Sequence, residues 1–299
     1  MNADQPEHAT SLSPIMAWIN ELMPSILFQN VVACILTFLQ AVYINRIVVK
    51  HRMGSEPTLW PGLVYILLCS LLPHYTYLSA VLIANTFILV AFSDIFKIYK
   101  RPFVVKFIFN SGVFISVAAM IYPPYITYLL AGFIGLAIIR SFKTKEVMQY
   151  ICGLSVPFIL YGTWSYYRSV FQENMNGLWQ NQFGFPANLI PNNTNGYIHL
   201  ALILLPILIA IFSYGNYSMK KSIQVQKKID ILFWMIASSM IALFINDNLT
   251  HDHLLMLAIP LGILLSMNLL KIKSAIIPEL IHLSILILIG LVHFGVLAF

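Results

Sequence analysis

Lysine and arginine follow an alternating pattern along this chain of 299 residues. Long apolar runs dominate the chain, and sixteen of its 17 Lys and Arg residues fall on every second connector between these runs. The exception is Arg168, which lies on the other set of connectors. Because cytoplasmic loops of membrane proteins retain Lys and Arg, the pattern predicts a multi-pass membrane protein whose basic connectors face the cytoplasm.

The composition excludes a water-soluble core. Hydrophobic residues make up 59% of the chain and charged residues 9%, with a mean hydropathy of +0.82, whereas a soluble domain carries about 25% charged residues. The formal net charge of +6 lies in short loops beside apolar runs. Membrane lipids with anionic headgroups are therefore the expected partners of this basic face, and nucleic acid is not.

Ten apolar segments approach or exceed the ~17–25 residues that a helix needs to cross a hydrocarbon core, although the second and the fifth are short. The predicted fold class is all-α: a polytopic transmembrane helical bundle of about ten spans, with both termini non-cytoplasmic. The segments cover residues 25–45, 59–73, 77–96, 103–121, 124–140, 147–166, 197–217, 229–245, 253–270 and 275–298.

No Pro/Ser-rich linker, low-complexity tract or clear repeat divides the chain, so residues 1–299 are expected to form a single integral membrane domain. Residues 1–24 are predicted to be a periplasmic tail with an interfacial helix near Pro14–Met23. Residues 167–196 form the largest outward connector. Its aromatic residues, Trp179 among them, favour a loop folded back on the outer interface.

The outward connector of residues 246–253 is the densest polar cluster in the sequence. Asp247, Asp252 and His253 are the candidate catalytic residues, because carboxylates beside a histidine supply an acid–base pair. A solvated turn between two spans explains the same residues. The spacing matches no metal-ligand pattern, so no metal site is predicted. The candidate substrate contacts at this face are Arg168, His74, His251 and Trp179.

Polar residues also lie within the apolar segments. Glu279 and His282 lie within about 60° of each other on the last span, and they are functional candidates unless they reach water at the helix end. Gln40 and Asn85 are expected to form hydrogen bonds between helices. Pro260 lies near the middle of the ninth span, where a proline leaves backbone carbonyls free.

Several motifs carry a family resemblance. Together they resemble an uncharacterised polytopic inner-membrane protein family of Bacteroidota, some members of which are labelled carotenoid monooxygenases, a label that these residues do not support. The resemblance implies a Gram-negative inner membrane and supplies no reaction. The motifs are Trp60-Pro61, Cys69–Pro73, Leu78–Ala80 with Asn85, Gly112, Ala118–Pro123, Arg140–Phe142, Lys145-Glu146, Gly153 before Pro157, and His253–Pro260.

Two classes of function are compatible with these residues. The first is envelope biogenesis, in which the outer face handles a lipid-linked sugar or a similar amphiphile and Arg168 contacts its phosphate. The alternative is a non-enzymatic transporter, or a membrane subunit of an envelope assembly with partner proteins. The residues identify neither a cofactor nor a reaction, and they leave open whether the chain is an enzyme.

Overall fold

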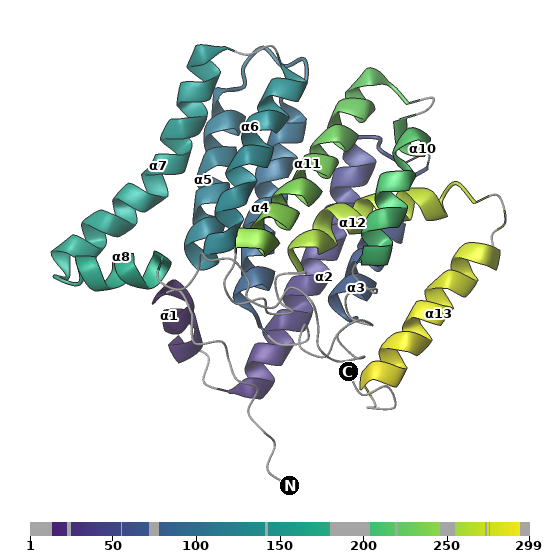
Figure 1. Ribbon diagram of the computed structural model, residues 1–299, viewed down its shortest axis with the longest axis horizontal. Helices are drawn as coiled ribbons and strands as arrows, with labels where there is room; N and C mark the ends of the chain where they lie inside the picture. The colour runs from purple at the N-terminus through teal and green to yellow at the C-terminus, as the bar shows by residue number, and fades with distance from the viewer. Residues whose placement is uncertain are drawn as a thin grey trace, which may run out of the picture.

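The computed structural model describes residues 14–22, 25–54, 56–71, 78–140, 143–179, 204–218, 221–245, 255–272, 274 and 276–293. These residues form helices and no strand (Figure 1). The prediction of an all-α fold is therefore confirmed over the described part of the chain. The elements of the central bundle are α2 (Ile26–Lys50), α3 (Trp60–Cys69), α4 (Ala80–Lys97), α5 (Val105–Ile121), η2 (Pro123–Thr127), α6 (Tyr128–Ile139), α7 (Thr144–Tyr167), α11 (Ile223–Ile245) and α12 (Leu255–Leu269).

The remaining helices lie around this bundle. The short helices α1 (Pro14–Leu22) and α8 (Phe171–Trp179) contact each other at one end of it (Figure 1). A helix over residues 204–212 continues through α10 (Tyr214–Ser218), which contacts α11 and α12. The helix α13 (Ile276–His293) stands at the opposite side of the molecule from α7 (Figure 1).

Three of the described helices, α2, α4 and α11, are long and apolar enough to cross a membrane. Several others are apolar but shorter. The shortest, α3, has 10 residues, or roughly 15 Å of helix, about half of a hydrocarbon core. It packs against α2 and α12 in the bundle.

Glycines let α5 and α7 approach each other closely. A Cβ atom on Gly153 would lie 2.3 Å from the backbone oxygen of Phe109, and one on Gly112 would lie 2.6 Å from that of Tyr150. No larger residue fits at either position without moving a helix. Small residues at a helix crossing are the usual means of packing within membranes, where lipid provides no hydrophobic drive for association.

The basic connectors after α2, between α4 and α5 and after α6 meet the start of α11 at the end of the bundle opposite α1 and α8 (Figure 1). Arg140 donates to the backbone oxygen of Arg101 at 3.1 Å, which joins the connectors on either side of α5 and α6. Lys227 donates to the backbone oxygen of Ile139 at 3.3 Å, and Lys228 contacts His51. The fold thus gathers Lys and Arg residues that are far apart in sequence onto one end.

Candidate functional site

Most of the outward residues predicted to act on a substrate lie outside the described part of the chain: Asp247, Asp252, His253, His251 and His74. Trp179 ends α8, but its side chain also lies outside what is described. Among the described residues, no group of three or more His, Cys, Asp or Glu residues is placed to hold a metal ion.

Arg168 lies immediately after α7 and is exposed. Its guanidinium carbon is 5.6 Å from the centre of the Trp164 ring. Ser169 follows in the left-handed conformation, with φ of 59°. The amide of Val170 then donates back to the Ser165 oxygen at 3.1 Å, which completes a Schellman end to the helix. This turn ends α7 and connects it directly to α8.

The helices α1 and α8 surround this end of α7. Asn174 of α8 donates to the hydroxyl of Ser165 at 3.0 Å, which ties α8 to α7. The helix predicted near Pro14–Met23 is present as α1, and its Trp18 side chain is 61% exposed. Figure 1 shows both short helices at the end of the bundle where α7 finishes. An exposed tryptophan on a short helix suits the membrane interface.

A crevice opens between α5, α6 and α7 on the Arg168 side of the glycine contact. Its volume is about 390 Å³. Pro157 lies in this part of α7, and because proline has no amide hydrogen it leaves the Gly153 carbonyl without its helical donor. Figure 1 shows α7 diverging from α5 toward α8. The lining residues are Ile115, Ser116, Ala119, Leu129, Leu154, Ser155, Phe158 and Ile159.

Two serines are the polar members of this otherwise apolar lining. Ser155 donates to the Ile151 carbonyl of its own helix at 2.9 Å. The hydroxyl oxygen of Ser116 is buried and has no hydrogen-bond partner. A buried hydroxyl without a partner is unfavourable, but this oxygen is not accessible from the crevice.

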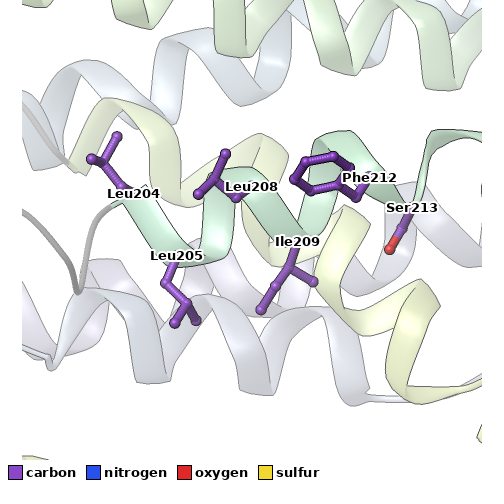
Figure 2. A pocket seen from close by; sticks show the side chains of 6 residues that line it. All are labelled: Leu204, Leu205, Leu208, Ile209, Phe212 and Ser213. Atoms are coloured by element: carbon purple, nitrogen blue, oxygen red, sulfur yellow. The ribbon is translucent and has the colours of Figure 1, made fainter.

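A second hollow lies along the helix over residues 204–212. It has a volume of about 520 Å³, and Figure 2 shows its six labelled side chains, five of them hydrocarbon. Only Ser213, at the end of the helix, contributes a polar atom. Nothing in this lining distinguishes one acyl chain from another, so it has the character of a lipid-facing surface.

The interior of the bundle holds a hydrogen-bonded network that ties α2, α3 and α4 together. The amide of Gln40 donates to the Leu82 carbonyl at 2.7 Å and to the Thr86 hydroxyl at 2.8 Å. The Tyr65 hydroxyl donates to Gln40 Oε1 at 2.6 Å. The prediction that Gln40 bonds between helices is confirmed.

The network continues toward α12. The Asn85 amide donates to the Leu255 carbonyl at 3.0 Å, and the hydroxyl of Tyr125 donates to Asn85 Oδ1. The prediction for Asn85 is therefore also confirmed. These groups satisfy one another, so the network stabilises the bundle and leaves no free polar atom of its own for a ligand. The tyrosines were not singled out from the sequence, because they lie within ordinary apolar runs.

Glu279 and His282 on α13 are in different surroundings. His282 is half-buried, and its ring lies 6.2 Å from the ring of Trp60 in an edge-on arrangement. Glu279 is exposed and does not face the bundle interior.

The fold and this geometry define the protein as an all-helical bundle with candidate membrane-spanning helices, an apolar crevice and an exposed cation at the end of one crevice wall. Comparison with protein-family models, with curated proteins and with solved structures found no match.

Proposed function

We propose that this chain is a multi-pass protein of a bacterial inner membrane, with about ten spans and both termini outside. It handles an amphiphile with an anionic head at the outer face, such as a lipid-linked sugar of envelope biogenesis. The observation that carries this proposal is the apolar crevice between α5, α6 and α7. One of its walls is α7, the helix that ends at the exposed Arg168.

The orientation follows from charge. The basic connectors gather at one end of the bundle, and this end is cytoplasmic by the positive-inside rule. Arg168, α1 and α8 then belong to the outer side. Reporter fusions after Lys145 and after Phe299 should read cytoplasmic and external, respectively. Two fusions on the same side would contradict ten spans.

The head of the amphiphile must supply most of the affinity. An acyl or prenyl chain gains little by leaving lipid for the crevice, because lipid tails are as apolar as the lining. Arg168 offers a phosphate a charged partner with several donors. It lies nine residues beyond Ile159 in the sequence, roughly 13 Å along α7, so a single lipid reaches both positions.

Filling the crevice tests the proposal. Ser155→Phe places a ring in the crevice at a residue that is itself exposed, whereas Cys152→Phe on the same helix adds the same ring outside the lining. The full-length protein is purified in detergent and exposed to a photoreactive polyprenyl phosphate. We expect Ser155→Phe and Arg168→Gln each to reduce crosslinking at least fivefold, with Cys152→Phe unchanged. Equal labelling of all four proteins would refute binding in the crevice.

Catalysis is a separate question. Asp247, Asp252 and His253 remain the predicted acid–base residues at the outer face. If Asp252→Asn abolishes envelope function in cells while lipid crosslinking is preserved, the protein transforms its lipid. If substitution of each of the three residues leaves function intact, the protein acts instead as a transporter or as a membrane subunit of an envelope assembly.

A further inference from the structure

A lysine and a histidine are buried together at the basic end of the bundle, away from the crevice. Lys228 lies in the second turn of α11 and its side chain is fully buried. His51 follows α2 directly and is 8% exposed. Lys228 Nζ lies 3.0 Å from His51 Nδ1, so two elements distant in the sequence present these groups to each other.

The contact fixes the proton on the imidazole ring. An ammonium group donates and does not accept, so Nδ1 accepts from Lys228 and the ring proton lies on Nε2. This Nε2 atom is buried and has no hydrogen-bond partner. The ring is held edge-on against Phe96, with 5.7 Å between ring centres. A second donor is therefore buried beside the lysine without an acceptor.

The surroundings of the pair are strongly cationic. Lys50, Lys97 and Arg101 are close enough to act on His51 electrostatically. Asp94 is the nearby carboxylate, and it already bonds Lys97 at 2.6 Å. Among the described residues no carboxylate forms an ion pair with Lys228. A buried ammonium without a counter-ion is costly, so the site has a clear deficit of negative charge.

We propose that His51 and Lys228 form a binding site for a phosphate group at the basic end of the bundle. His51 Nε2–H donates to the phosphate, and Lys228, which is bonded at the opposite edge of the ring, contributes positive charge without contacting the phosphate. Phosphate oxygens are strong acceptors for such donors, and basic pockets between helices on the cytoplasmic side of membrane proteins bind anionic headgroups. The phosphate belongs either to an anionic phospholipid or to a free phosphate from the cytoplasm. This site is independent of the crevice at the other end.

Two substitutions test the pair, with a matched control. Lys228→Met removes the charge and keeps an unbranched side chain. His51→Asn keeps an acceptor near the Nδ1 position for Lys228 and removes the Nε2–H donor. Lys145→Met removes an exposed charge at the same end of the bundle. The melting temperature of each full-length protein is followed in detergent while inorganic phosphate is added, and again in vesicles of phosphatidylglycerol or of phosphatidylcholine.

We expect phosphate or phosphatidylglycerol to raise the melting temperature of the native protein and of Lys145→Met. Both His51→Asn and Lys228→Met should bind at least tenfold more weakly. Stabilisation by phosphatidylglycerol alone identifies a lipid headgroup, and stabilisation by inorganic phosphate identifies a free anion. No stabilisation by either, or equal stabilisation of all the variants, would overturn the proposal. If Lys228→Met does not fold, the phosphate response of His51→Asn alone tests the site. In the native protein, the ¹⁵N shift of His51 Nε2 should then change when phosphate is added, and an unchanged shift would overturn the proposal.

Discussion

The hydroxyl of Tyr128 donates to the backbone carbonyl of Met256 at 2.9 Å. This carbonyl would normally accept from the amide four residues later, but that residue is Pro260, which has no amide hydrogen. The carbonyl that Pro260 leaves without its helical donor is thus bonded inside the bundle. Tyr128 is fully buried and also contacts the Ser239 hydroxyl at 2.7 Å, so α6 and α11 together satisfy the defect in α12.

Tyr128→Phe should lower the free energy of unfolding by about 1–3 kcal/mol, because it leaves a buried carbonyl without its main donor. In a Pro260→Ala background the loss should be smaller by about 1 kcal/mol, since an alanine at this position supplies the missing amide. The four proteins of this double-mutant cycle are compared by reversible unfolding in detergent. Additive effects would show that the Tyr128 hydrogen bond does not compensate for the amide hydrogen that Pro260 lacks.

The contact between α5 and α7 gives a second prediction. Gly153→Ala places a methyl group against the backbone of Phe109, so the helices must separate and we expect a loss of about 1–3 kcal/mol. Gly290→Ala is the matched control, because nothing lies within 4 Å of its added Cβ. That change should be neutral or stabilise α13 by up to about 1 kcal/mol. Equal melting temperatures for the two variants would contradict the close packing.

The end of α2 gives a third prediction. Arg52 lies in the left-handed region with φ of 52°, and the amide of Met53 donates to the Val48 carbonyl at 3.0 Å. Glycine normally occupies this position of a Schellman turn. Arg52→Gly should therefore stabilise the protein by about 0.5–1 kcal/mol, measured by thermal unfolding. Arg52→Ala removes the same charge and keeps the strain, so a matching gain there would assign the effect to charge instead.

Much of the helical pattern could be predicted from hydropathy. The segments predicted over 103–121 and 253–270 correspond closely to α5 (Val105–Ile121) and α12 (Leu255–Leu269). The start of α11 could not be predicted in this way. Lys227 and Lys228 lie in its first turns, although their charge had placed them in a connector. A helix continues through charged residues when other elements provide partners for them, and hydropathy contains no information about such partners.

The crevice also could not be predicted from the sequence. It depends on Gly112 meeting the α7 backbone and on α7 diverging from α5 toward α8 (Figure 1). Both features require knowing which face of each helix meets which neighbour. Gln40 and Asn85 were predictable as bonding residues because a lone amide in an apolar run needs a partner. Their actual partners, Tyr65 and Tyr125, follow only from the packing.

The last prediction concerns pH. Burial, and then Lys228, Lys50, Lys97 and Arg101, lower the pKa of His51 from 6.5 to about 3. The carboxylate of Asp94, which lies beside these groups, is paired with Lys97. The unfolded chain therefore binds a proton at His51 below pH 6.5, and the folded protein does not until near pH 3. The contribution of His51 to the free energy of unfolding is therefore fully present above pH 6.5, and it is lost as the pH falls toward 3.

The slope is at most about 1.4 kcal/mol per pH unit. Between pH 7 and pH 5 the melting temperature of the native protein should therefore fall more steeply than that of His51→Asn, in which the carboxylates titrate alike but this group is absent. Bound phosphate should flatten the difference, because an anion beside the ring favours the imidazolium and raises the pKa of His51. Parallel melting curves for the two proteins, with and without phosphate, would show that His51 is not buried as a neutral ring.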